Sequence, residues 1–251
     1  MFVVACAVIL ACHDSTAPAV IVSADLESLL AESISGQSLG GSAMLASGVP
    51  FIGAAAMPRG TCGFDASSSL FVCPRSATPA DGITSQTSFQ LLDGVNTPLR
   101  AYDATKVAAI RTISDVNGTM SLGSSSLSIS VTAHNDATLG GLLPSGAAHA
   151  LNATGTSDMT LTTGSLTSNA KMSTTIKDLV LPRSADSNPY PISGTITTES
   201  VFDNPNAAPM RVIMTFNGTS VATVAITTRG ETQNCTMDLS HRPSFPVCPA
   251  D

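Results

Sequence analysis

Aromatic side chains and charges are scarce in this chain of 251 residues. It has no Trp and only two Tyr, and charged residues make up 12% of the sequence. The hydrophobic fraction of 43% is nevertheless enough for a folded core, which must be built mainly from Val, Ile, Leu, Met and Ala. The 11 Lys and Arg residues never cluster, so the basic footprint of a nucleic-acid-binding protein is missing.

Motifs for catalysis and metal binding are also missing. The four histidines do not lie three or four residues from another His or Cys, as they would in a zinc site: His13, His134, His149 and His241. The Gly-x-Ser-x-Gly elbow of many hydrolases is absent. We therefore expect no metal, no cofactor and a non-enzymatic role. The alternative is a hydrolase whose site is assembled from scattered residues, with a Ser or Asp beside His134 or His149.

Hydroxyl side chains are abundant, with 62 Ser and Thr residues in total. A surface covered by hydroxyls rather than charges is typical of exported β-rich proteins, in which Thr and Ser occupy the solvent face of strands.

The N-terminus carries the strongest single motif. Residues 2–11 form an uncharged apolar run that is too short to span a bilayer but matches the core of a secretory signal. The run ends in Ile9-Leu10-Ala11-Cys12, which resembles a bacterial lipobox, although the usual preceding Lys or Arg is missing. The resemblance implies that Cys12 is acylated and anchors the protein to a membrane. The alternatives are an ordinary cleaved signal and a buried apolar strand that ends in Cys.

These features predict a signal peptide over residues 1–11, a lipidated tether over 12–22 and a single β-rich domain over 23–251. His13 is not the Asp that retains lipoproteins at the inner membrane, so the resemblance favours the outer membrane, on its periplasmic or surface face.

Four further cysteines fall into two local pairs, and each pair ends in Cys-Pro. Of the three possible connectivities, local pairing is the simplest. It would close two short loops, each contributing about 3 kcal/mol in the chain-entropy model. Such bonds persist in an oxidising compartment, and zinc ligands are usually spaced more closely. We therefore predict two disulfides, Cys62–Cys73 and Cys235–Cys248.

The pattern along the chain predicts one short helix followed by strands. Leu26, Leu29, Leu30 and Ile34 share one helical face, so a helix is expected over residues 23–34. The uncharged, Gly-rich segment 39–58 could be core, a flap or an interface; a membrane span is the remote alternative. From Phe64 onward apolar residues alternate with polar ones.

Turn signals occur at Asn117-Gly118, Asn217-Gly218 and Asp93-Gly94, and the two Asn-Gly pairs are strong hairpin signals. The fold class expected is all-β and mainly antiparallel: a single curled sheet, half-barrel or sandwich of about nine or ten strands.

The order of landmarks after Cys62 resembles that of a group of exported bacterial proteins, described as hypothetical lipoproteins. The segments that carry the resemblance are CGFDASSSLFVCP, DGITSQTSFQLLDGVNTPLRAYDATKVAAI, YPISGTITTE and RVIMTFNGTSVATVAI. The resemblance covers most of residues 62–240. The members of the group share a Cys-to-Cys-Pro segment and a Thr-rich β region, and the resemblance implies no activity.

The sequence thus predicts a membrane-tethered envelope lipoprotein with a binding or structural role and a protein or apolar ligand as partner. A second hypothesis is a carrier or chaperone of apolar ligands, with the 39–58 segment lying beside a half-barrel.

Overall fold

The computed structural model describes residues 19–21, 26, 28–30, 61–78, 82–121, 127–146, 148–183, 188–204, 206–240 and 245–249. Within these residues lie fourteen strands, of which ten are five residues or longer: β1 (Ala19–Ile21), β2 (Thr61–Asp65), β3 (Leu70–Val72), β4 (Ser76–Thr78), β5 (Ile83–Leu92), β6 (Pro98–Leu99), β7 (Ala109–Ser121), β8 (Leu127–Gly140), β9 (His149–Thr163), β10 (Leu166–Leu181), β11 (Ser193–Phe202), β12 (Met210–Phe216), β13 (Val221–Thr228) and β14 (Glu231–Asp238).

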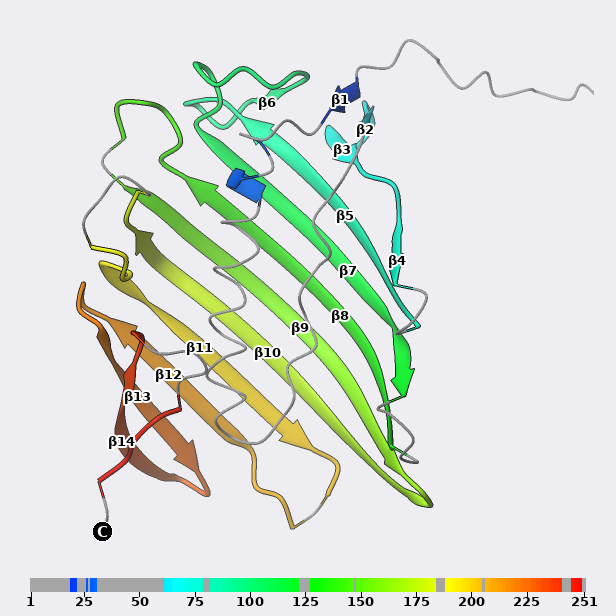
Figure 1. Cartoon of the computed structure of the whole chain (residues 1–251), viewed down its shortest axis with the longest axis vertical. Helices are drawn as coiled ribbons and strands as arrows, with labels where there is room; N and C mark the ends of the chain where they lie inside the picture. Colours follow the sequence, from blue (N-terminus) through cyan, green and yellow to red (C-terminus); the bar gives the residue numbers. More distant parts are fainter. Residues whose placement is uncertain are drawn as a thin grey trace, which may run out of the picture.

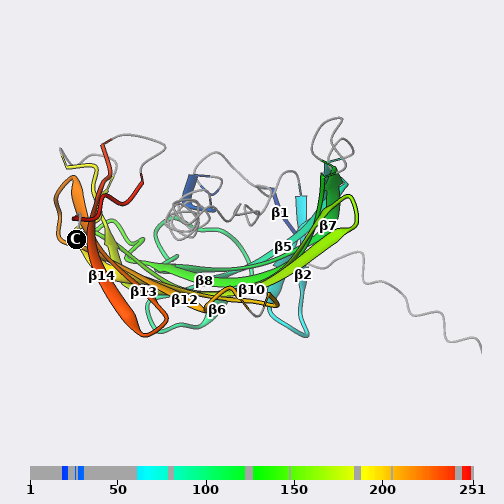
Figure 2. The same cartoon turned by 90° about the horizontal axis from the view of Figure 1, so that it is seen from below.

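All fourteen strands belong to one antiparallel sheet in the order β1-β2-β3-β5-β7-β8-β9-β10-β11-β12-β13-β14, with β4 and β6 paired to β5. From β7 to β14 each strand lies beside its successor, so the chain runs up and down (Figure 1). Seen along its strands, the sheet is bent into an open trough (Figure 2). The prediction of a single curled antiparallel sheet is confirmed.

Alternation of apolar and polar residues gives the sheet two different faces. In β12, Val212, Met214 and Phe216 are buried, whereas Arg211 and Thr215 are exposed and Ile213 is partly buried. Successive side chains of a strand point to opposite faces, so this alternation separates a buried inner face from a hydroxyl-rich outer face. The helical segment lies inside the trough, so the inner face is the concave one (Figure 2).

The predicted N-terminal helix is confirmed at its centre, where Leu26 and residues 28–30 are helical. Leu26 and Leu30 are completely buried and belong to one core cluster with Phe71 and Phe89. The helix therefore covers the inner face near β3 and β5. The ends of the predicted helix, Cys12 and the apolar segment 39–58 lie outside the described residues.

The predicted tether over residues 12–22 is too long at its C-terminal side. Ala19–Ile21 form β1, which pairs with β2 so that Val20 lies opposite Cys62. Val20 also packs against the core cluster of the first strands. These three residues therefore belong to the folded sheet, because backbone pairing with β2 and the packing of Val20 stabilise them more than a solvated linker would.

Two of the three predicted turns are confirmed. Asn217-Gly218 lies in the connection between β12 and β13, where the backbone N–H of Thr219 donates to Asn217 Oδ1 at 3.1 Å. Asp93-Gly94 lies in the connection from β5 to β6, which pair with each other, and the backbone N–H of Thr97 donates to Asp93 Oδ1 at 2.7 Å.

The prediction of a hairpin at Asn117-Gly118 is wrong, because both residues lie inside β7 and pair with β5 and β8. Gly118 lets the backbone of Gly82 lie close to β7, because a Cβ at position 118 would lie 2.2 Å from the carbonyl oxygen of Gly82. The local turn preference is overridden by pairing on both sides of the strand.

The inner face holds two large apolar clusters. In the cluster at the N-terminal end of the sheet, the Phe71 ring stacks on Phe89 at a centroid distance of 5.2 Å and is tilted against Phe64 at 5.1 Å. The cluster that continues to the C-terminal end, from β8 to β14, is mainly aliphatic and includes Val212, Met214 and Val224. Both predicted disulfides, Cys62–Cys73 and Cys235–Cys248, are present, one at each end.

Candidate binding groove

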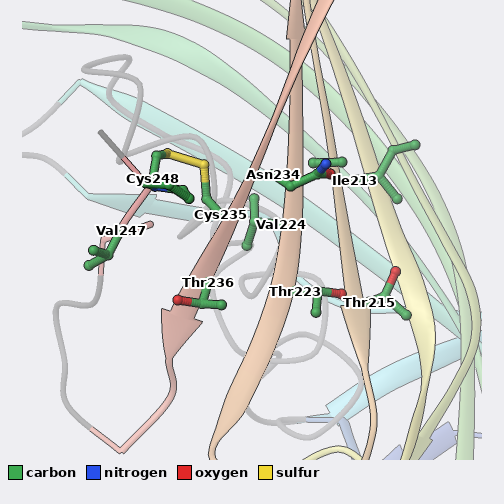
Figure 3. A pocket seen from close by; sticks show the side chains of 11 residues that line it. Ile213, Thr215, Thr223, Val224, Asn234, Cys235, Thr236, Val247 and Cys248 are labelled. Carbon is green, nitrogen blue, oxygen red and sulfur yellow. A yellow bond between two sulfur atoms is a disulfide. The ribbon is translucent and has the colours of Figure 1, made fainter. Parts of the chain in front are cut away.

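A groove of about 560 Å³ lies at the C-terminal end of the sheet, on its outer face (Figure 3). This volume is in the range of sites that bind small ligands, about 300–1,000 Å³. The described residues that line it come from β12, β13, β14 and the segment 245–249: Ile213, Thr215, Thr223, Val224, Ala225, Asn234, Cys235, Thr236, Val247, Cys248 and Pro249.

Strand register brings three threonines of the groove into one row. Thr215 lies opposite Thr223, and Thr223 lies opposite Thr236, so the row crosses three neighbouring strands (Figure 3). Adjacent strands are about 4.7–4.9 Å apart, which sets the spacing of the three side chains. We call Thr215, Thr223 and Thr236 the groove threonines.

A second row of the groove runs beside the first. Ile213 lies opposite Ala225, and Ala225 lies opposite Asn234. Ile213 and Ala225 give this part of the floor an apolar character, and Asn234 adds an amide that can both donate and accept. The floor therefore offers hydrogen-bonding groups along one line and mainly apolar contacts along the next.

The wall of the groove is the C-terminal segment 245–249. Val247 pairs with Thr236 through two backbone hydrogen bonds, of 3.0 and 2.7 Å, and the next residue is Cys248, which is bonded to Cys235. Pro249 follows and has no N–H with which to continue the pairing. The disulfide that the sequence predicted thus fixes the wall of a surface groove, a consequence that the spacing of the cysteines does not reveal.

The lining residues that the structure describes bring no charge and no group suited to acid–base or nucleophilic chemistry. None of the described lining residues is charged, and both cysteines are in a disulfide. The hydroxyl groups of the three groove threonines make no hydrogen bond with another described residue, so they are available to a ligand. This arrangement can bind an uncharged molecule.

The described histidines lie elsewhere, on different strands. His134 Nδ1 is 2.7 Å from Asp115 Oδ1 on the outer face of β8 and β7, and both side chains are more than half exposed. The neighbouring Asp136 accepts from Arg111 Nε at 2.9 Å, and this hydrogen bond lowers the pKa of the Asp136 carboxyl. His149 begins β9.

The Asp115–His134 pair has the orientation of a general base, but among the described residues no hydroxyl or thiol is hydrogen-bonded to His134. A pair on the open outer face also lacks the exclusion of water that most catalytic sites provide. His13 and His241 lie outside the described residues.

A polar belt crosses the middle of the inner face, perpendicular to the strands. Its central residues, Asn135, Gly155 and Thr174, are opposite one another on β8, β9 and β10. Thr198 on β11 continues the belt and is 1% exposed, yet among the residues that the structure describes its hydroxyl has no hydrogen-bond partner. A hollow beside the central residues has a volume of only about 10 Å³, which is the space of a single water.

No group of three or more His, Cys, Asp or Glu residues in the described part of the chain could hold a metal ion. None of the helical residues that the structure describes forms a helix long and apolar enough to cross a membrane. Comparison of the chain with protein-family models, with curated proteins and with solved structures gave no match.

The threonine row was missed from the sequence. A two-residue Asn217-Gly218 turn would place Thr215 opposite Ser220, whereas the observed connection is longer and places Thr215 opposite Thr223. The next turn, Arg229-Gly230, has positive φ at both residues, 53° and 82°, as in a type I′ hairpin, and brings Thr236 opposite Thr223. Arg-Gly is not among the common type I′ pairs, so the sequence did not reveal this turn or the register of β13 with β14.

Proposed function

We propose that this chain is an exported envelope protein, tethered to a membrane through a lipid on Cys12, whose β domain binds an uncharged ligand in the C-terminal groove. The observation that supports binding is the uncharged groove, which has three available hydroxyls in register and a wall fixed by a disulfide. Two disulfides favour an oxidising compartment, in agreement with export.

We propose the groove rather than the inner face as the site of the ligand. A carrier of apolar molecules needs an apolar cavity of ligand size, whereas the hollow beside the polar belt has room for one water and is lined by Asn135, Ser157 and Thr174 among others. The groove is about fifty times larger, as the ratio of about 560 to about 10 Å³ shows.

Metabolic labelling with a palmitate analogue tests the tether. The wild-type chain, expressed in a diderm bacterium, should carry the label and sediment with membranes, and Cys12→Ala should carry none. Equal label on both proteins, or none on the wild type, would show that Cys12 is not the anchor. Cys6→Ala is the matched control and should keep the label.

A chemical-shift titration tests the groove. Uncharged small-molecule probes should shift the amide signals of β12 to β14 and leave those of β8 and β9 unchanged. Ala225→Arg places a long side chain on the floor of the groove and should abolish the shifts. Probes that shift β8 and β9 equally would contradict a site at this end of the sheet.

A further inference from the structure

The chemistry of the groove also points to a class of ligand, an inference that rests on the proposed function. We infer that the groove takes a neutral, polyhydroxylated chain, a glycan, which lies across β12, β13 and β14 along the groove threonines. Three observations carry this inference: the charge of the lining, the repeat of the hydroxyls and the pairing of the edge strand.

Charge complementarity selects an uncharged partner. The whole chain has a formal net charge of −7, yet the described groove residues include neither an acid nor a base. An ionic ligand would lose hydration in the groove and find no opposite charge there to compensate for that loss. Acidic polymers would also be repelled by the protein as a whole.

The spacing of the groove threonines favours a sugar chain over a peptide as the ligand. Each Thr hydroxyl can donate one hydrogen bond and accept others, so the row matches a ligand whose own hydroxyls do both. The row repeats at about 4.7–4.9 Å, which is close to the width of one sugar ring. An extended peptide repeats its same-side groups at about 6.4–6.8 Å, twice the rise per residue, and would fall out of register after two contacts.

Pairing at β14 disfavours the peptide in a second way. A peptide would add as a strand parallel or antiparallel to β14, at the edge of the sheet. That edge is occupied at Thr236 by Val247, and Pro249 has no N–H to support further pairing. A chain that crosses the strands meets no such obstacle.

Apolar contacts complete the match. Sugar rings present C–H groups on their faces as well as hydroxyls at their rims. Ile213 and Ala225 lie beside the groove threonines, and the exposed Val247 forms the wall. The described lining contains no aromatic residue on which a ring could stack. We therefore expect weak binding of a short oligosaccharide and tighter binding where several tethered copies meet one long glycan.

The test uses the full chain and a panel of neutral hexasaccharides: a β-1,4-linked glucan, a β-1,4-linked N-acetylglucosamine oligomer and an α-1,6-linked glucan. Binding is measured by amide chemical shifts and by calorimetry. We expect at least one hexasaccharide to shift the signals of β12 to β14. The triple variant Thr215→Val, Thr223→Val and Thr236→Val should bind about tenfold or more weakly, because it keeps the shape of the groove and loses its hydroxyls.

The outer face supplies a matched control. Thr154, Thr175 and Thr197 form another row in register, across β9, β10 and β11, and none of them lines the groove. The triple variant Thr154→Val, Thr175→Val and Thr197→Val should bind the same hexasaccharide as tightly as the wild type. Circular dichroism shows whether each variant is folded. If the groove variant is not, Ala225→Arg takes its place and should abolish binding.

Each other outcome overturns the inference. Equal losses in the two triple variants would show that general surface hydroxyls, not the groove, bind the sugar. If no hexasaccharide binds while other uncharged probes still shift β12 to β14, the glycan class is wrong and the proposed groove function survives. If an extended Thr-Val peptide binds instead, the partner is a polypeptide. If no probe of any kind shifts these strands, the proposed function fails as well.

Discussion

The two ends of the sheet carry the same sequence motif in different surroundings. At the N-terminal end, Cys62 and Cys73 are both buried among the rings of Phe64, Phe71 and Phe89. At the C-terminal end, Cys235 is buried, but its partner Cys248 is only half-buried, in the wall of a groove. The same Cys-to-Cys-Pro segment thus forms a disulfide within the core at one end of the sheet and a disulfide in the wall of a surface groove at the other.

The two Cys-Pro segments also differ in how their backbones pair with the sheet. The backbone N–H of Cys73 donates to the carbonyl of Thr87 on β5, and Pro74 follows. Val247 pairs with Thr236, and Cys248 and Pro249 follow. Pro249 has no N–H with which to extend the pairing at the edge strand β14, whereas after Pro74 the pairing with β5 resumes at Ser76 in β4.

The largest effect should come from the aromatic cluster of the N-terminal end. Phe89→Ala removes a completely buried ring that stacks on Phe71, and we expect a loss of about 3–5 kcal/mol in the free energy of unfolding. Phe245→Ala is the counterpart at the other end, where the ring is 54% exposed, and should change stability by less than about 0.5 kcal/mol. Urea denaturation measures both, and comparable losses would refute the contrast.

The two disulfides should differ both in stability and in function. They close loops with sequence separations of 11 and 13, so each contributes about 3 kcal/mol by loop entropy. Removing Cys62 and Cys73 together should cost more than removing Cys235 and Cys248, because both of the first pair are buried. Only the second double variant should weaken ligand binding, since it frees the wall of the groove. Denaturation without reductant and the titration described above measure the two effects.

Thr198→Val should raise stability by about 1 kcal/mol, because it removes a buried hydroxyl without a hydrogen-bond partner in the described part of the chain and keeps the shape of the side chain. Thr197→Val changes the neighbouring residue on the outer face and should have an effect within about 0.5 kcal/mol. Thermal unfolding of both variants provides the comparison. A destabilising Thr198→Val would indicate that a bound water satisfies the hydroxyl.

The smallest effects concern two exposed carboxyls. Hydrogen bonds from the side chain and the backbone of Thr105 lower the pKa of Asp103 to about 2, near the N-terminal end. The backbone N–H of Asn169 is the main cause that lowers the pKa of Asp203, which follows β11. A lowered folded-state pKa stabilises the fold above the unfolded value, and this contribution is lost as the pH falls through the folded value.

Side-chain truncation should therefore affect the two carboxyls unequally. Thr105→Ala should raise the pKa of Asp103 clearly, since it removes the largest cause. Asn169→Ala should raise that of Asp203 only slightly, because the backbone donor remains. Carboxyl signals followed by NMR from pH 1.5 to 6 measure both midpoints, and equal shifts would show that the backbone bond at Asp203 is not dominant.

Much of the fold could be read from period-two alternation, as in Val212, Met214 and Phe216, and both disulfides followed from local spacing. Pairing over long distances could not be read in this way. Asn117-Gly118 has the composition of a turn but lies between β5 and β8, and Ala19–Ile21 were assigned to a linker although β2 was available as a partner. In each case the deciding neighbour is remote in the sequence.

The sequence by itself determined the all-β class, the two faces and the pairing of the cysteines, because alternation and short loops are local properties. Tertiary structure alone decided that the sheet stays open, that Leu26 and Leu30 cover its inner face and that Thr215, Thr223 and Thr236 meet in one groove. Register is the physical reason for the groove: a shift of one residue between two strands would turn Thr215, Thr223 or Thr236 to the other face of the sheet.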